Sequence, residues 1–363
     1  MFDEKIRRLI TWESGEKAFP LSIELSPTLR CNLSCLFCWR QEKNDIDSGE
    51  LSFEKYKKII KEASDMSVKE VRIIGGGEPL FRKDTFEIMK EIKSRGMFGY
   101  ICTNGTMFNE KNIEELVRIG FDHIKISLHG STAKVHDSLV NVKGSFKKTL
   151  KNMILFSKWK KKLEKEKPLI EIGTVLVREN YKDILNIVNL AYSLDVQYFF
   201  VEPITVYSKM GEKLKLRKKE IKDFEKIAIE SKKIADKYGI KNNLNDFIES
   251  EYVRKTGKMK ELLKKDNKNK RSRFLSLSCY EPWLRIGIRV DGTVCPCGFF
   301  DQESTENIKE KTLEDIWFGD YFNLRRRQIL NGKLPNHCKK CCMTLVVENK
   351  LIRNELEKFK LMI

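Results

Sequence analysis

Short apolar segments of strand length alternate with longer amphipathic segments of helical length over residues 21–203. The strand-like segments are 21–26, 71–74, 100–103, 123–128, 170–177 and 198–202, and the helical ones are 53–65, 84–95, 109–118, 145–162 and 180–194. This alternation demands a parallel sheet covered by helices, whose functional residues gather where the strands end. The sequence therefore predicts an α/β domain of six strand units.

Three cysteines follow the first strand-like segment within eight residues: Cys31, Cys35 and Cys38, in the spacing CxxxCxxC. A disulfide framework leaves one thiol over, a Cys35/Cys38 redox pair leaves Cys31 unexplained, and structural zinc needs a fourth ligand. Three thiolates instead suit a centre with one open coordination position. On a four-iron cluster, which normally takes four cysteines, an unligated iron can bind a cosubstrate and pass it an electron.

A glycine-rich turn follows the second strand-like segment, and it reads Gly75, Gly76, Gly77, Glu78 and Pro79. Glycines permit close approach of the backbone at the end of a strand, and Glu78 adds a carboxylate there. An ordinary strand-to-helix turn has the same composition, so the turn alone does not specify a function.

Together the two motifs resemble the radical S-adenosylmethionine (SAM) superfamily, including the aromatic Phe37 before the third cysteine and a GGEP-like turn. The resemblance implies a partial (β/α)6 TIM-like barrel. It also implies that Cys31, Cys35 and Cys38 hold a 4Fe-4S cluster whose fourth iron chelates SAM. The implied SAM contacts are Phe37 near the adenine, Gly76, Gly77 and Glu78 at the amino group, Ser127 near the ribose, and the Val175 backbone at the adenine.

A second group of cysteines lies near the carboxyl end of the chain. Cys279 precedes two strand-like segments, 283–290 and 293–299, joined by the hairpin signal Asp291-Gly292, and Cys295 and Cys297 are expected on the return strand. Cys338, Cys341 and Cys342 follow. Thiols from separate elements like these form zinc ribbons and iron–sulfur sites alike.

This half resembles the SPASM/twitch extension of radical SAM enzymes, which implies a small cysteine-rich domain with an auxiliary 4Fe-4S cluster. The resemblance nominates Cys279, Cys297, Cys338 and Cys341 as its ligands. No cysteine follows Cys342, which favours the shorter twitch form with one auxiliary cluster. Cys295 and Cys342 are left as core thiols or alternative ligands, and structural zinc stays an alternative.

Five regions are expected along the 363 residues: a lead-in helix over 1–20, the barrel over 21–203, a basic helical connection over 204–274, the auxiliary domain over 275–345 and a helix over 346–363. The formal net charge of +18 and the Lys- and Arg-rich stretch 254–273 suit an anionic substrate or nucleic acid, but equally a solvated linker. Cys102 is expected in the core, and His129, His136 and Asp137 in a structural or substrate-loop role.

The expected function is reductive cleavage of SAM to a 5'-deoxyadenosyl radical that abstracts a hydrogen from a substrate. Oxidation of a small molecule, or bond formation on one, ranks slightly above peptide modification. An external low-potential donor of the ferredoxin or flavodoxin type would supply electrons. A nucleic-acid-binding protein with a zinc ribbon is the alternative of another class. No apolar run approaches ~18 residues, and ten cysteines without a secretory signal suggest a soluble cytoplasmic protein.

Overall fold

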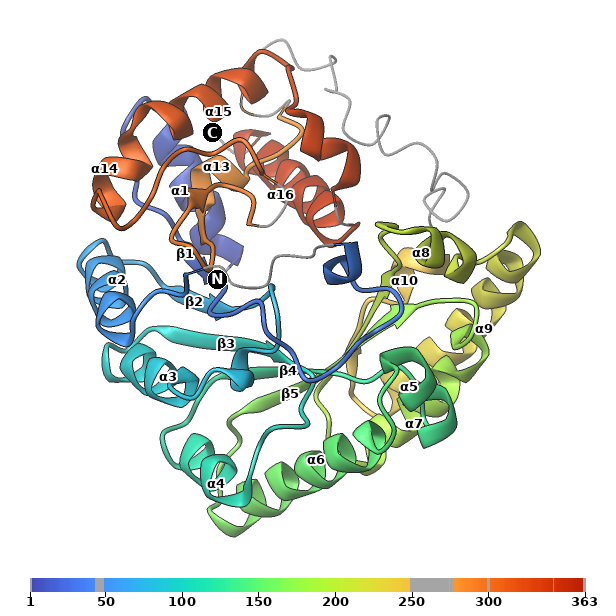
Figure 1. Ribbon diagram of the computed structural model, residues 1–363. Helices are drawn as coiled ribbons and strands as arrows, with labels where there is room; N and C mark the ends of the chain where they lie inside the picture. The colour runs from blue at the N-terminus through green and yellow to red at the C-terminus, as the bar shows by residue number, and fades with distance from the viewer. Residues whose placement is uncertain are drawn as a thin grey trace.

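The computed structural model describes residues 2–42, 49–248, 274, 277–298, 301–341 and 343–361. Its centre is a nine-stranded sheet in the order β7-β6-β5-β4-β3-β2-β1-β8-β9 (Figure 1). The strands are β1 Ser22–Leu25, β2 Glu70–Ile73, β3 Phe98–Thr103, β4 His123–Ser127, β5 Leu169–Leu176, β6 Tyr198–Pro203, β7 Lys241–Asn242, β8 Arg285–Ile288 and β9 Val294–Cys295. Strands β1 to β6 are parallel and lie in chain order. The predicted α/β fold with a partial (β/α)6 barrel is confirmed.

Helices cover the outer side of this curved sheet (Figure 1). In the barrel they are α1 Phe2–Glu13, α2 Phe53–Asp65, α3 Thr85–Ser94, α4 Glu110–Arg118, α5 Ala133–Val140, α6 Ser145–Lys162, α7 Ile184–Ser193, α8 Lys209–Leu214, α9 Lys218–Lys237 and α10 Asn245–Ile248. The carboxyl-terminal part adds α13 Glu281–Leu284, α14 Leu313–Phe318, α15 Asp320–Leu330 and α16 Met343–Leu361.

Helix α2 shows how the sequence produces these elements. Its N-cap Ser52 accepts a hydrogen bond from the Lys55 backbone N–H at 3.2 Å, which satisfies one otherwise unpaired donor of the first turn. Apolar residues at helical spacing, Tyr56, Ile59 and Ile60, are then buried against the sheet.

The two faces of the sheet differ in chemistry because successive strand side chains point to opposite sides. Ile23, Val71 and Ile101 are among the apolar residues that pack against the helices in the main core. The inner face instead carries polar and charged side chains, among them Glu24 and Arg72. Cys102 also lies on this inner face and is partly exposed, so its expected place in the core is wrong.

The predicted hairpin does not stand apart from the barrel but extends its sheet. Strand β8 pairs parallel with β1, with Ser22 opposite Arg285, and β9 returns antiparallel. The hairpin strands are shorter than expected. Trp283 lies in helix α13, which has Pro282 in its first turn, and Cys297 lies beyond the end of β9.

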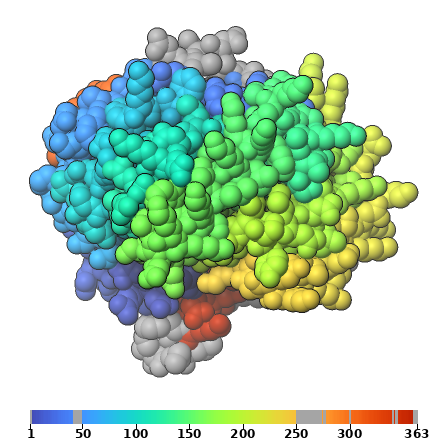
Figure 2. Space-filling view, turned by 90° about the horizontal axis from the view of Figure 1, so that it is seen from below, coloured from blue at the N-terminus to red at the C-terminus, as the bar shows by residue number. Residues whose placement is uncertain are grey.

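Helix α16 lies beside α1 and against β6 (Figure 1). Seen from below, its residues emerge between those of α1 and the yellow segment that follows β6 (Figure 2). A helix from the carboxyl-terminal part of the chain therefore packs against the first helix and the sixth strand of the barrel.

The strand–helix pattern continues past residue 203, since α9 packs on α7 and β7 pairs parallel with β6. The domain boundaries drawn from the sequence stay predictions. The basic stretch 254–273 lies outside the described residues. Within the described part of the chain, no helix combines the length and the apolar character that crossing a membrane requires.

Candidate cofactor and cluster sites

The loop that carries Cys31, Cys35 and Cys38 follows β1 and is fastened by backbone hydrogen bonds on both sides. On one side the Gly77 N–H donates to the Thr28 carbonyl at 2.7 Å, and the Glu78 N–H donates to the Arg30 carbonyl at 2.8 Å. On the other side the loop is tied to the end of α5, where the Leu36 N–H donates to the Leu139 carbonyl at 3.0 Å. The cysteine loop and the glycine turn therefore form one unit at the carboxyl ends of β1 and β2.

Gly76 and Gly77 are needed because the cysteine loop passes directly over them. Gly76 has a φ of +69°, and a β-carbon there would lie 2.5 Å from the Thr28 carbonyl oxygen. A β-carbon on Gly77 would lie 1.9 Å from the Arg30 carbonyl oxygen. The close backbone approach inferred for these glycines is thus made to the protein's own loop.

Glu78 is buried, and its carboxylate accepts three hydrogen bonds from the protein. The donors are the Thr103 hydroxyl at 2.6 Å, the Asn104 N–H at 2.7 Å and the Leu80 N–H at 3.1 Å. Burial raises the pKa of Glu78, while these hydrogen bonds act in the opposite direction. The side chain thereby joins the turns after β2 and β3, and its predicted contact with SAM stays a prediction.

Asn104 is a site residue that the sequence did not single out for a role. Its amide Nδ2 donates to the Asn32 side chain at 2.9 Å and lies 4.0 Å from the Cys31 sulfur. Its Oδ1 accepts from the Thr106 N–H at 2.9 Å. The only sequence signal was the Thr103-Asn104-Gly105 turn, because asparagine after a strand commonly forms hydrogen bonds to its own loop.

The three loop thiols are close enough to affect one another electrostatically. Burial raises the pKa of Cys31, and burial raises that of Cys35 to about 12, with Cys38 contributing in both cases. Such thiols stay protonated unless a bound cation stabilises their thiolates. This donor chemistry fits a metal cluster rather than a free nucleophile. Among the described residues, however, no three His, Cys, Asp or Glu side chains converge on a single-ion site, so the ligand assignments stay predictions.

Phe37 and Val175, both predicted to lie near the adenine, meet in one small apolar cluster. The Phe37 ring lies edge-on to His129, with ring centroids 4.9 Å apart. The Val175 N–H donates to His129 Nδ1 at 3.2 Å, and the Val175 carbonyl accepts from Asn180 at 2.9 Å. Both backbone groups of Val175 therefore already have partners in the chain. Ser127 ends β4 on the inner face, opposite Gly173 of β5.

His129 and His136 form a buried pair rather than a solvent-facing acid and base. The centroids of the two stacked rings lie 5.8 Å apart, and the backbone N–H of His129 donates to His136 Nδ1 at 3.1 Å. Burial lowers the pKa of His129 to about 3 and that of His136 to about 4, so both are neutral at physiological pH. Asp137 accepts from the N–H groups of Gly144 and Phe146 at the start of α6. These contacts are structural.

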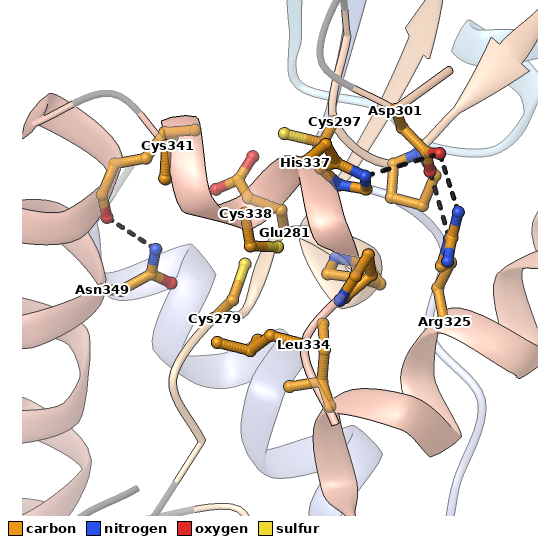
Figure 3. Close-up of a pocket in the computed structure, with 15 residues that line it drawn as sticks. Cys279, Glu281, Cys297, Asp301, Arg325, Leu334, His337, Cys338, Cys341 and Asn349 are labelled. Carbon is orange, nitrogen blue, oxygen red and sulfur yellow. Dashed lines mark hydrogen bonds and ion pairs between the residues drawn. The ribbon is translucent and has the colours of Figure 1, made fainter. Parts of the chain in front are cut away.

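The second group of cysteines meets in a cavity between the hairpin, α13, α15 and the start of α16. Cys279, Cys297, Cys338 and Cys341 all line it (Figure 3). The sulfurs of Cys279 and Cys338 point toward one another, and Cys297 approaches from the hairpin side (Figure 3). Burial raises the pKa of Cys338 to about 11, and it also raises the pKa of Cys279 well above its ordinary value. The four nominated cysteines thus line one cavity.

The two remaining cysteines of this group differ from those four. Cys295 does not line the cavity; it is fully buried, and its thiol donates to the Gly298 carbonyl at 3.0 Å. Because β9 ends at Cys295, the chain turns before Cys297, and the two thiols point to different places. Cys342 lies outside the described residues.

A buried ion pair anchors the wall of this cavity. Arg325 contacts both oxygens of Asp301, at 2.8 and 3.2 Å, and Tyr321 donates to Asp301 at 2.6 Å. His337 lies beside the same carboxylate at 3.8 Å (Figure 3). These contacts position the segment that carries Cys338 against the turn after β9. Glu281 also lines the cavity, where Arg285 holds its carboxylate at 3.2 Å.

Comparison with protein families gives two matches that divide the chain as the two sites do. The model of the radical SAM superfamily matches residues 25–191, and that of the SPASM iron–sulfur cluster-binding domain matches residues 279–342. The chain belongs to the radical SAM superfamily and carries a SPASM domain. A radical SAM domain followed by a SPASM domain implies two 4Fe-4S clusters and SAM as cofactors.

Relatives of this radical SAM protein act on different molecules. An AdoMet-dependent heme synthase of Methanosarcina barkeri is 30% identical over 54% of this chain and 51% of its own length. A PqqA peptide cyclase of Rhizobium meliloti is 24% identical over 89% of this chain and 79% of its own length. The chain spans about half the length of the first two curated relatives it matches.

Solved structures show the same fold at low sequence identity. SuiB of Streptococcus suis bound to its precursor peptide SuiA superposes with a TM-score of 0.64 at 20% identity. The match covers 88% of this chain and 70% of SuiB. This likeness concerns the fold alone.

Proposed function

We propose that this radical SAM protein cleaves SAM reductively and uses the resulting 5'-deoxyadenosyl radical to take a hydrogen from a peptide or small-molecule substrate. One observation carries the proposal. The three-cysteine loop is fastened to the glycine turn by the Gly77–Thr28 and Glu78–Arg30 hydrogen bonds, at the carboxyl ends of two parallel strands. Sites of parallel barrels lie at these strand ends.

In this proposal Cys31, Cys35 and Cys38 hold the first cluster and leave one iron open. A 4Fe-4S cluster with SAM bound at its open iron supplies the electron that breaks a carbon–sulfur bond of SAM. Other residues of the chain position the loop that carries these cysteines. Asn104 holds Asn32 beside Cys31, and Glu78 holds the Asn104 turn through its backbone N–H.

The SAM molecule would extend from the cysteine loop across the strand ends. Gly76 and Gly77 let the cysteine loop approach the turn after β2, Phe37 would contribute an aromatic wall, and Ser127 lies on the inner face of β4. Val175 contributes its side chain to the same apolar wall as Phe37, since its backbone groups are bonded to His129 and Asn180.

Cys279, Cys297, Cys338 and Cys341 would hold the auxiliary cluster, and their common cavity supports this assignment over Cys295.

The substrate class is proposed as a peptide or a small molecule because the relatives include a peptide cyclase and a heme synthase. The electron donor would be an external low-potential protein of the ferredoxin or flavodoxin type. The ten cysteines suit a cytoplasmic location, because thiols stay reduced there.

The experiment is an anaerobic assay of the reconstituted and reduced protein for 5'-deoxyadenosine made from SAM without added substrate. Cys35→Ala should abolish this product, because two thiolates cannot replace three at an open cluster. Ser94→Ala, at the exposed end of α3, serves as the control and should keep wild-type activity. SAM cleavage that survives loss of Cys31, Cys35 and Cys38 together would refute the proposal.

A further inference from the structure

The inner face of the barrel sheet is polar and partly exposed. On the outer face of the central strands Val71, Ile101 and Ile124 are completely buried. On the inner face, Arg72, Cys102, Lys125, Ser127, Phe200 and Glu202 stay partly exposed although they lie in central strands. A packed barrel core would bury these residues, so the inner face borders a space large enough to admit solvent or a ligand.

Most charged groups of this inner face already have partners. Glu171 accepts from Lys125 at 3.0 Å and contacts His123 at 2.9 Å. Arg285 contacts Glu281 at 3.2 Å and Glu24 at 3.6 Å. In each pair a neighbouring group compensates a charge removed from water, although Arg285 Nε makes no hydrogen bond.

Arg72 is the exception. In the described part of the chain its guanidinium has no hydrogen bond and no carboxylate within 4 Å, and its buried Nε has no hydrogen-bond partner. Burial and the nearby Arg285 act to lower the pKa of Arg72, but Glu70 and Glu24 outweigh them and raise it, so the side chain stays charged. A charged side chain with a buried N–H group that lacks a hydrogen bond costs free energy unless something else binds it.

The orientation of Arg72 indicates what that partner is. Its guanidinium lies over the ring of Tyr100, 4.4 Å from the ring centroid. Stacking covers one flat side and leaves the N–H edge free, and this edge matches the two oxygens of a carboxylate in one plane.

The position of Arg72 lies between the two candidate cluster sites. Two residues, Ile73 and Ile74, separate it from the glycine turn, and it pairs in register with Glu24 of β1. Glu24 in turn lies against Gly298, since a β-carbon added to Gly298 would be 2.7 Å from the carboxylate oxygen of Glu24. Gly298 directly follows Cys297, one of the thiols that line the auxiliary cavity.

We propose that Arg72 binds a carboxylate of the substrate inside the barrel, so that the substrate is a carboxylic acid or a peptide with an acidic residue. This inference rests on the proposed function, because it takes the barrel interior as the substrate site. Arg72 is a substrate-binding residue here, and Tyr100 positions it. Neither belongs to a cluster or to the predicted SAM contacts.

Anaerobic isothermal titration calorimetry of the reconstituted protein with SAM tests the proposal. The probes are glutarate and an N-acetyl-glutamyl dipeptide amide, each compared with its neutral amide counterpart at constant ionic strength. Wild-type protein should bind a carboxylate probe saturably and its amide not. Arg72→Gln should weaken the binding about ten-fold or more, and Arg72→Lys should weaken it too, because lysine lacks the planar fork. Arg7→Gln, at an exposed arginine of α1, should bind like the wild type.

The two probes separate the two sources of a carboxylate. Tighter binding of the glutamyl peptide indicates an acidic peptide, and tighter binding of glutarate indicates a small acid. Equal affinity of wild type and Arg72→Gln for both probes, equal binding of acids and amides, or no saturable binding would overturn the inference. SAM cleavage without substrate, measured on the wild-type and Arg7→Gln preparations, tests the proposed function separately.

Discussion

Gly77 lies under the Arg30 carbonyl so closely that a β-carbon at position 77 would come within 1.9 Å of its oxygen. The Glu78 N–H beside it donates to that same carbonyl. A side chain at position 77 would therefore push the cysteine loop away from the turn after β2. The position of the three thiols depends on this glycine although it contributes no ligand.

We accordingly expect Gly77→Ala to lower the iron content of the first site. The rate of SAM cleavage should fall about ten-fold or more, which corresponds to an increase of about 1.4 kcal/mol in the activation free energy. Iron analysis and the 5'-deoxyadenosine assay measure both effects. Gly211→Ala is the matched control, since the nearest atoms would lie at an ordinary 3.6 Å and its φ is not positive. Wild-type iron content and activity in Gly77→Ala would contradict the structural role given to this contact.

The residues that line the auxiliary cavity indicate which cysteine substitutions should lower the iron content of the protein. Wild-type protein reconstituted anaerobically should contain about eight irons per chain, four for each cluster. Replacing Cys279, Cys297, Cys338 or Cys341 by Ala should remove roughly half of them. Cys295→Ala should keep the full content, because its thiol points to the Gly298 carbonyl and not into the cavity. About four irons with stoichiometric zinc in the wild type would instead identify a zinc ribbon.

The buried carboxylate of Glu78 predicts a loss of stability on conservative substitution. Glu78→Gln would place an amide NH2 where an oxygen now accepts from Asn104 or Thr103, and one donor would lose its partner. We expect a decrease in the free energy of unfolding of about 1–3 kcal/mol, measured by urea denaturation under anaerobic conditions. Glu54→Gln, on the exposed side of α2, is the control. Equal stability of wild type and Glu78→Gln would show that Glu78 does not clamp the two turns.

The buried His129–His136 pair predicts a pH dependence of stability. Both pKa values are lowered by burial, to about 3 and about 4, below the ordinary value near 6.5. The unfolded chain thus binds more protons than the folded one below about pH 6.5, and stability must fall as the pH is lowered through that range.

We expect this loss to be on the order of 1–2 kcal/mol per histidine between about pH 6.5 and pH 5. The variant His136→Gln cannot titrate there and should have a shallower slope of unfolding free energy against pH. Urea denaturation at several pH values, with iron content checked at each, provides the measurement. Lys134→Gln on the exposed side of α5 should keep the wild-type slope. Parallel slopes in His136→Gln and wild type would contradict neutral burial of His136.

Local patterns in the sequence were enough to predict the elements of the barrel. The strand-like segments correspond to β1 to β6, because apolar residues at period two flanked by helical repeats depend only on neighbouring residues. Cysteine spacing likewise placed Cys31, Cys35 and Cys38 on one loop. The hairpin at Asp291-Gly292 followed from turn chemistry, although its strands are shorter than expected.

Contacts between distant segments were decided only by the tertiary structure. Nothing local to residues 285–288 indicates that β8 adds to the β1 edge of the barrel. The choice of Cys297 over Cys295 depends on where β9 ends, and the need for Gly77 depends on a loop more than forty residues earlier in the chain.

The sequence by itself determined the strand–helix alternation, the two groups of thiols and, through its motifs, the superfamily. The pairing of charged side chains could be seen only in the folded structure. Arg72 and Glu171 look alike in the sequence, as charged residues within strands. Glu171 contacts both Lys125 and His123, whereas Arg72 has no carboxylate within 4 Å among the described residues. The physical reason is that strand periodicity fixes the face on which a side chain lies, whereas its partners come from neighbouring strands, whose register is set by packing across the whole sheet.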